Sequence, residues 1–433
     1  MKKILTAISV LALSAQLFAG GIDNKSNLST GYLRNPSRNT ETKRPEAVLY
    51  NIAGTSFMED GLAFNVGNQF IYKNYANDLD FNNTKYEDKV DVFFFPDFEA
   101  VYKKDNWAAF AGFGVFAGGG SLDYKDGTGA TYLALYSAGY KTTLQSLMAA
   151  GKTQEQAAPV ADAMGKSIAS NHSLKAYTVT MGEILGFSYN VTENVSLAAA
   201  GRLLHTSTNM QLKCAGIKDL NGGDKIKYEG SGIGFGGIFG VNVVDLVPKF
   251  KFSAQYQTIT KLDVEFDSVT GNIAGQFGIV KGKKYHNDLP AVLSLGAGYS
   301  PIETVDISMS FNYYFNKQAN MQNPLGRADL DYKDSWEIGL GCDWQATEKL
   351  CVSIGTMYSN QGTKSDVNSA FNPVLDSLVG GCGVEYKFTK QLMATLAYMH
   401  CRYFSQDYEF GGKEMELSKD TYLCSLGLTF KPF

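Results

Sequence analysis

The side chains that could act as nucleophiles or metal ligands are few and widely spaced in this chain of 433 residues. No Gly-x-Ser-x-Gly segment occurs, and no histidine falls beside a serine and an acid in a recognisable arrangement. The six cysteines show no Cys-x-x-Cys spacing, and the four histidines form no ligand pattern. We therefore expect no catalytic residue, no metal site and no cofactor. These residues are Cys214, Cys342, Cys351, Cys382, Cys401, Cys424, His172, His205, His286 and His400.

We read the cysteines as small hydrophobic residues, although export of the chain would permit a disulfide between Cys342 and Cys351. Export is predicted by residues 1–19, which combine Lys2 and Lys3 with an apolar run and a small-residue end at Ala19, the layout of a cleaved signal peptide. Nothing further along approaches the roughly 20 consecutive apolar residues of a spanning helix, so the inner membrane is not the destination.

Several aromatic and thioether side chains could instead bind an apolar ligand. They occupy alternating runs in which the neighbouring residues would face lipid, so they themselves would face inward. In a water-filled channel the inward face should be polar, whereas flexible thioethers and aromatic rings suit an apolar guest of variable shape. The alternatives are that these residues pack on another part of the chain, or that a bulge has reversed the inward and outward positions. The predicted ligand path consists of Phe93, Phe95, Phe110, Phe116, Met393 and Met399.

A basic residue in such a lumen could steady a carboxylate. Arg202 and Lys213 are candidates, but nothing in the sequence selects either. The net charge is -4, or about -6 without the two leader lysines, and provides no basic footprint for nucleic acid.

The elements that must position these residues are strands, because apolar and polar residues alternate with period 2 from Gly61 onward. Fourteen runs are long enough to cross a bilayer as tilted strands. They are 61–76, 88–103, 107–122, 174–190, 194–211, 228–244, 249–266, 289–300, 304–316, 332–345, 349–360, 377–388, 392–406 and 420–431.

An even number of strands, alternating short and long connections, and aromatic residues at the run ends are typical of a bacterial outer-membrane β-barrel. We therefore predict an all-β, antiparallel transmembrane barrel of about 14 strands over residues 61–433. A secreted soluble β-sandwich or propeller would also alternate. It is the weaker interpretation because nearly every run here has an apolar face, which a soluble fold would have to hide in a core.

Residues 20–60 fit neither the leader nor the strands, because they are polar, rich in Gly, Asn, Ser and Thr, and without a period. We expect this segment to fold inward as a plug, or hatch, inside the barrel. Gly118, Gly119 and Gly120 end the third run and predict a kink or bulge there, with a plain turn as the alternative.

One insertion, roughly residues 132–170, has helical spacing instead, and Thr153 begins a capping-box sequence. It joins the third and fourth strands, which puts it outside the cell. It could be a plain lid over the mouth or a groove on which apolar ligands land. The groove would be built from Leu144, Leu147, Met148 and Met164.

Several segments resemble the FadL/TodX family of outer-membrane transporters for long-chain fatty acids and other hydrophobic compounds. The most telling is 49–54 (LYNIAG) followed by 58–61 (MEDG), which is similar to the Asn-Pro-Ala-Gly segment before the first strand of that family. Ile52 stands where the family usually has Pro, and Phe433 is out of phase with the last alternating run. Supporting segments are 95–102, 112–118, 289–296 and 372–376.

The resemblance implies a fourteen-stranded barrel, an internal hatch, an outer hydrophobic groove and a kinked third strand that releases ligand sideways. Matched by motif, Asn51, Ala53 and Gly54 would carry the hatch role and residues 118–120 the kink. The leading hypothesis is passive uptake of a fatty acid or similar hydrophobic molecule by a monomer in contact with outer-membrane lipids. The alternatives are a general porin and, from another class, an outer-membrane lipid hydrolase; loop-mediated adhesion is a minor one.

Overall fold

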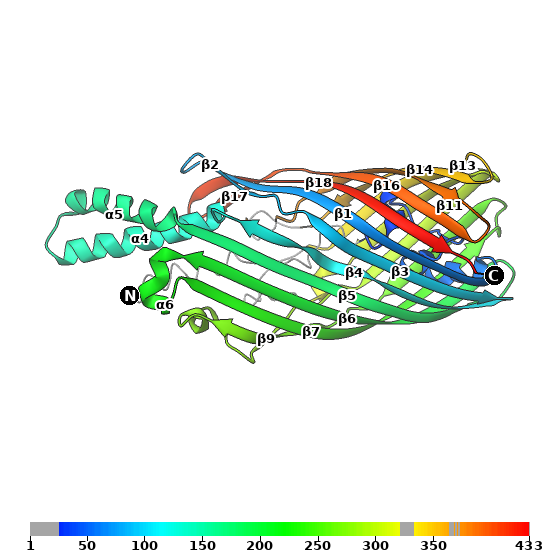
Figure 1. The fold of residues 1–433 in the computed structure, drawn as a ribbon, viewed down its shortest axis with the longest axis horizontal. Coiled ribbons are helices and arrows are strands. Elements are labelled where there is room, and N and C mark those ends of the chain that lie inside the picture. The colour runs from blue at the N-terminus through cyan, green and yellow to red at the C-terminus, as the bar shows by residue number, and fades with distance from the viewer. Residues whose placement is uncertain (1–25, 321–332, 363–367, 369, 371–372, 433) are drawn as a thin grey trace.

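The computed structural model describes residues 26–320, 333–362, 368, 370 and 373–432. The predicted leader, the first part of the 20–60 segment and Phe433 lie outside these residues. The strands form one antiparallel sheet that closes on itself, because the first strand pairs with the last from Phe64–Phe430 to Leu79–Met415. Each predicted run overlaps a wall strand, and the closed fourteen-stranded barrel is confirmed (Figure 1).

The wall strands are β1 (Gly61–Leu79), β3 (Val92–Lys104), β4 (Trp107–Tyr124), β5 (His172–Asn190), β6 (Val195–Cys214), β7 (Lys225–Val244), β8 (Phe250–Gln257), β11 (Val292–Ile302), β12 (Val305–Tyr314), β13 (Ser335–Gln345), β14 (Leu350–Asn360), β15 (Ser377–Lys387), β16 (Leu392–Tyr403) and β18 (Lys413–Phe430). Shorter strands extend the sheet at one end: β2 (Thr84–Asp88), β9 (Asp263–Thr270), β10 (Lys284–His286) and β17 (Gln406–Phe410).

Side chains alternate between the two faces of the wall, as the period of the sequence requires. Outward positions carry exposed apolar residues such as Leu340, Ile354 and Leu396, the surface that a barrel presents to lipid. Both strand termini of the wall lie at the end where β1 begins and β18 ends, which is the periplasmic end in bacterial barrels. No helix in the described part of the chain is long and apolar enough to span a membrane.

The predicted run 249–266 is wrong as a single strand. It divides into β8 and β9, and the residues between them pack on the inner face of β7. A Cβ on Gly234 would lie 2.4 Å from the backbone oxygen of Lys261, and one on Gly236 would lie 2.4 Å from Oγ1 of Thr260. The segment can bend inward only because β7 has no side chains at these two positions.

The insertion between β4 and β5 forms a hairpin of two helices, α4 (Gly129–Ala149) and α5 (Gln154–Ala169), that projects beyond the barrel (Figure 1). Thr153 caps α5 with the predicted capping box. The helices approach closely at Gly139 and Gly165, where a Cβ would meet the opposite helix at about 3 Å. The first half of α4 is buried in an apolar cluster with Leu79, Leu122 and other residues at the outer end of the wall strands.

The remaining helices are short. The N-terminal segment contains α2 (Thr30–Arg34), α3 (Ala47–Tyr50) and the 3-10 helix η1 (Ile52–Phe57). Outside it are η2 (Ala215–Ile217), α6 (Lys218–Asn221), η3 (Ala274–Phe277) and η4 (Asn316–Gln318).

Candidate functional site

The N-terminal segment lies inside the barrel, and we call residues 26–57 the plug. From Ser26 to Ser56 every residue is buried except Lys43 and Arg44. Its hydrogen bonds reach strands on opposite sides of the wall: Thr30 donates to Asp97 on β3 at 2.8 Å, and the Ser37 hydroxyl donates to Ser310 on β12 at 3.0 Å. The plug is therefore held by polar contacts all round its circumference.

A cluster of buried charges fixes one side of the plug to β13 and β15. Asp343 accepts from Arg34 at 3.3 Å, from Arg38 at 3.2 Å and from Arg44 at 3.3 Å. The Arg44 side chain also places Nε 2.8 Å from each carboxylate oxygen of Glu385. Buried charges of this kind are tolerated only when they are paired and hydrogen-bonded.

Two glutamates of the plug complete this cluster. Glu46 lies 3.2 Å from Arg34 and 3.5 Å from Arg38, while Glu41 lies 2.9 Å from Arg38 and 3.1 Å from Arg44. Burial alone would raise the pKa of Glu41, but the charges of Arg44 and Arg38 outweigh burial and lower this pKa to about 2. Glu41 therefore stays ionised over the physiological pH range and keeps the arginines paired.

The residues matched to the family hatch motif contact β6 and β7. The Asn51 side chain donates to Asn242 on β7 at 2.8 Å, and the backbone oxygen of Ala53 accepts from Ser196 on β6 at 2.6 Å. A Cβ on Gly54 would lie 2.3 Å from the backbone oxygen of Glu41, so only glycine fits. Asn51 and Ala53 therefore anchor the plug to the wall, whereas Gly54 packs within the plug.

Ile52 makes a contact that the usual family residue could not make. Its backbone N–H donates to the side chain of Gln255 on β8 at 3.0 Å, whereas proline has no N–H. The departure from the family motif therefore adds one hydrogen bond between plug and wall.

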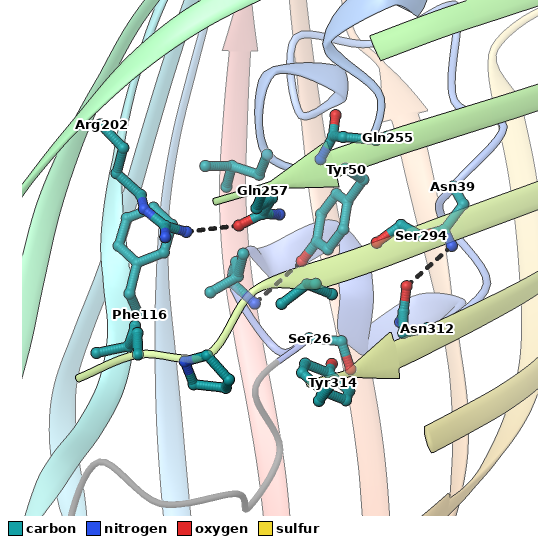
Figure 2. A pocket seen from close by; sticks show the side chains of 15 residues that line it. Ser26, Asn39, Tyr50, Phe116, Arg202, Gln255, Gln257, Ser294, Asn312 and Tyr314 are labelled. Atoms are coloured by element: carbon teal, nitrogen blue, oxygen red, sulfur yellow. Dashed lines mark hydrogen bonds between the residues drawn. The ribbon is translucent and has the colours of Figure 1, made fainter. Parts of the chain in front are cut away.

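A small cavity of about 60 Å³, room for a few water molecules, lies between the plug and the wall (Figure 2). We call it the lumen cavity. Leu28, Leu49 and Tyr50 of the plug line it, and Phe116 of β4 and Leu289 lie among the wall residues around it. Figure 2 shows Phe116 and Arg202 on one side, and the hydrogen-bonded pair Asn39 and Asn312 on the other.

Arg202 is the charged residue of this cavity. Its side chain is almost fully buried, with the residue 3% exposed, and one guanidinium nitrogen donates to Thr260 Oγ1 at 2.7 Å while another donates to the Gln257 side chain. The guanidinium carbon lies 5.5 Å from the centre of the Phe116 ring. Among the described residues no carboxylate pairs with Arg202, and its Nε has no hydrogen-bond acceptor. A desolvated cation without a counter-ion favours an anionic ligand.

The wall has an irregular stretch beside β4. Hydrogen-bond pairing of β3 with β4 runs only from Lys104–Trp107 to Phe98–Phe113, so the outer half of β4 pairs with β5 alone. In that half β4 carries two single-residue bulges, at Phe116 and at Gly119, and Gly118 and Gly119 have positive φ values of 66° and 105°. The second bulge lies within residues 118–120, the segment predicted as a kink.

Side chains fill the unpaired stretch between β3 and β4. Phe95 packs with Val115 and Val179, and a Cβ on Gly119 would lie 2.5 Å from the Phe95 ring. Beyond it, Asp88 of β2 accepts from the backbone N–H of Asp123 at 2.8 Å, and so joins the outer end of β4 to the sheet. The stretch is thus closed by packing rather than by backbone hydrogen bonds.

The six residues predicted to line one ligand path lie in different places. Phe116 lines the lumen cavity and Phe95 fills the unpaired stretch. Phe110 and Met399 belong to an apolar cluster with plug residues, the alternative left open by the sequence. Met393 borders a second cavity at the periplasmic end.

Phe93 was predicted to face inward, and this prediction is wrong. Its side chain is 60% exposed and lies edge-on to Tyr72, an outward residue of β1, with ring centres 6.1 Å apart. The pairing of β3 with β1 shifts register between Gln69 and Ile71, so the alternation expected from the sequence does not continue through this point.

The predicted outer-groove residues lie on the projecting hairpin. Met148 of α4 is 47% exposed and Met164 of α5 is 45% exposed, while Leu144 and Leu147 are partly buried. Lys213 pairs at 3.8 Å with Asp224 at the outer end of β6 and does not line the lumen cavity. The cysteines are all free, and within the described residues no group of histidine, cysteine and acidic side chains could hold a metal ion.

Sequence reasoning missed the wall partners of the plug and of Arg202. Asp343 and Glu385 stand at inward positions of their strands, and the three arginines of residues 34–44 were a signal that acids would face them. The position of Thr260 against β7 could have been anticipated from the alternating glycines at 230, 232, 234 and 236, because they leave one face of β7 without side chains.

Comparison with known proteins agrees with this geometry. The family model described as outer membrane protein transport protein (OMPP1/FadL/TodX) matches residues 160–410, more than half of the chain. Comparison with curated protein sequences gives no match.

Solved structures share the fold. A Pseudomonas aeruginosa FadL homologue is 13% identical with a TM-score of 0.67, and the match covers 93% of this chain and 98% of that one. The Pseudomonas putida toluene transporter TodX is 16% identical with a TM-score of 0.61, over 91% and 97%. The Ralstonia pickettii toluene transporter TbuX is 14% identical with a TM-score of 0.57, over 92% and 98%.

These structures are too distant in sequence to indicate more than a common barrel, but the family model covers the wall from α5 to β17 and identifies the chain directly. The protein therefore belongs to the OMPP1/FadL/TodX family, whose members are transport proteins of the bacterial outer membrane for hydrophobic compounds and not enzymes.

Proposed function

We propose that this protein takes up long-chain fatty acids, or hydrophobic acids of similar shape, passively, with the plug as a hatch and sideways release through the wall. The observation that carries the proposal is the unpaired stretch between β3 and β4 beside the Gly119 bulge. Side chains close this stretch, and they can change rotamer without breaking any backbone hydrogen bonds between the two strands. An apolar ligand could then pass from the lumen into lipid.

The proposed route begins at the hairpin, where Leu144, Leu147, Met148 and Met164 would collect apolar molecules. It continues to the lumen cavity, where Phe116 and Arg202 would hold the ligand, and leaves past Phe95 at the bulge of residues 118–120. The lumen cavity is too small for an acyl chain as it stands, so the plug would have to shift, with Asn51, Ala53 and Gly54 as its hinge to the wall.

The free energy of burying an acyl chain is large enough for binding without any catalytic group. Removing an acyl chain from water contributes about 0.8 kcal/mol for each buried methylene, so fourteen carbons give on the order of 10 kcal/mol before costs. Arg202 adds recognition of a carboxylate, because hydrogen bonds to a charged partner contribute about 1.5–3 kcal/mol. The unpaired guanidinium supports an acid over a neutral hydrocarbon as the ligand.

A general porin is the second candidate, but the continuous burial of residues 26–42 favours a closed lumen. The test is uptake of a radiolabelled long-chain fatty acid by cells expressing a variant without Gly119. Removing the bulged residue should restore regular pairing of β4 with β5 and straighten the outer half of β4 beside β3. Uptake should then fall about tenfold or more, with unchanged surface expression.

Deletion of Gly411, an uncrowded residue of the turn between β17 and β18, is the matched control and should leave uptake unchanged. Full uptake by the variant without Gly119 would exclude sideways release at this stretch. A large steady conductance of the unaltered protein in planar bilayers would instead favour the porin.

A further inference from the structure

A second cavity, of about 660 Å³, lies at the periplasmic end between the plug and the ends of β13–β16 and β18. We call it the vestibule. Its volume falls within the roughly 300–1,000 Å³ usual for small-molecule sites. It has no lining residue in common with the lumen cavity. The inner boundary includes the Arg44–Glu385 pair of the charge cluster.

Lysines outnumber acids at the rim of the vestibule, where Glu59 and Glu348 are the acidic lining residues. Lys349, Lys387 and Lys431 stand at the periplasmic ends of β14, β15 and β18, in positions that continue the inward face of each strand. Lys390 in the β15–β16 turn adds a fourth positive charge. Lys431 pairs with Glu59 at 2.7 Å. Within the described residues no acid lies within 4.0 Å of the other three.

The deeper surface of the vestibule is partly apolar. Phe57 of the plug, the adjacent Met58 and Met393 of β16 line it, and Met58 is buried. A phenyl ring and two thioethers adapt to a flexible hydrocarbon chain. A small inorganic anion would leave these groups unused, and a neutral hydrocarbon would leave the lysines without a partner. The combination fits a single-chain amphipathic anion, with its head at the lysines and its tail toward the plug.

We propose that the vestibule is a second ligand site, on the periplasmic side of the plug, that selects long-chain carboxylates by their charge. This inference rests on the proposed function, because it takes the transported molecule as the occupant. It adds a sorting step: carboxylates that pass the plug instead of leaving sideways are held at the periplasmic mouth, whereas uncharged hydrophobic molecules are not held there.

The test is photolabelling of the full protein in lipid nanodiscs with a palmitic acid that carries a diazirine near its tail end. The methyl ester of the same probe is the uncharged comparison. Mass spectrometry of labelled peptides separates the two sites, because Met58 and Met393 mark the vestibule while Phe116 and Leu289 mark the lumen cavity. The acid should label both sites and the ester only the lumen cavity.

Reversing two rim charges in the variant Lys349→Glu, Lys387→Glu should reduce vestibule labelling by the acid about tenfold, as expected for two partly solvated charge contacts. Labelling of the lumen cavity should not change. Lys104→Glu is the matched control, because Lys104 also lies at the periplasmic end but at an outward position of β3.

Equal vestibule labelling by acid and ester, or labelling insensitive to the charge reversal, would overturn the inference. Lumen labelling without vestibule labelling would overturn it while leaving the proposed function in place. If neither cavity were labelled by either probe, the proposed function would fail together with the inference.

Discussion

At the scale of single residues, Arg202 distinguishes this lumen from a simple apolar tube. Its partners, Thr260 and the Gln257 side chain, are neutral, and its Nε has no acceptor among the described residues. The positive charge is thus buried at a cost that an incoming carboxylate would offset. An anionic ligand would therefore complete the electrostatic balance of the site.

Replacing Arg202 with Met should therefore separate charged from uncharged ligands. Uptake of a labelled long-chain fatty acid should fall about tenfold or more, since a hydrogen bond to a charged group contributes about 1.5–3 kcal/mol. Uptake of the corresponding methyl ester should be unchanged. Competition assays with both probes, in cells with matched surface expression, measure the difference.

Arg202→Lys is the companion variant and should retain part of the acid uptake, because the charge remains while the planar fork is lost. An equal loss for acid and ester in Arg202→Met would mean that the residue only supports the local structure.

Individual residues were also the least predictable part of the sequence. Phe116 lines the lumen cavity although it is a bulged residue at which alternation is interrupted. Alternation failed for Phe93, where a register shift between neighbouring strands interrupts the two-residue period. Arg202 could not be selected over Lys213, because the difference depends on the inward bend at Thr260, a contact between segments far apart in the chain.

At the scale of elements, the charge cluster couples the plug to β13 and β15. Asp343 is shared by three arginines of the plug, so its removal takes a buried charged partner on the wall from all three. Glu41 and Glu46 come from the plug itself, and cannot hold it to the wall.

We expect Asp343→Asn to weaken attachment of the plug by about 3–5 kcal/mol, the usual effect of breaking a buried ion pair. The measurable result is faster entry of a chromogenic β-lactam, followed by its hydrolysis in the periplasm. Asp267→Asn, on the exposed side of β9, is the control and should behave like the unaltered protein. Unchanged entry in Asp343→Asn would show that the polar contacts elsewhere on the plug are sufficient.

Elements were predicted well where local pattern decides them. The capping box at Thr153 and the alternation of the wall strands depend on neighbouring residues and were visible directly. The interruption between β8 and β9 was not visible in the sequence, because the residues between these strands continue the normal alternation. The glycines on the adjacent strand β7 allow them to leave the wall, and this effect of a neighbour is absent from a local pattern.

At the scale of the whole molecule, the barrel and the plug are distinct layers joined by polar contacts and by an apolar cluster. Deletion of residues 21–56 should leave a folded, heat-modifiable barrel, because the wall is closed by its own β1–β18 ladder. Its lumen should then admit water and small polar solutes. Single-channel recording in planar bilayers should show a large conductance that the full-length protein lacks, and an unaltered conductance would contradict a plug that blocks the lumen.

The closure of the wall has a consequence for assembly. The plug precedes every wall strand in the chain, yet Ser26 bonds to Glu337 and Ser425 to the backbone of Thr30, contacts that span 311 and 395 residues. Contacts so distant in sequence form slowly, and β1 can complete the cylinder only when β18 arrives. The segment synthesised first must therefore keep its charges solvated until the last strand is in place, so the order of synthesis and the order of burial are opposite.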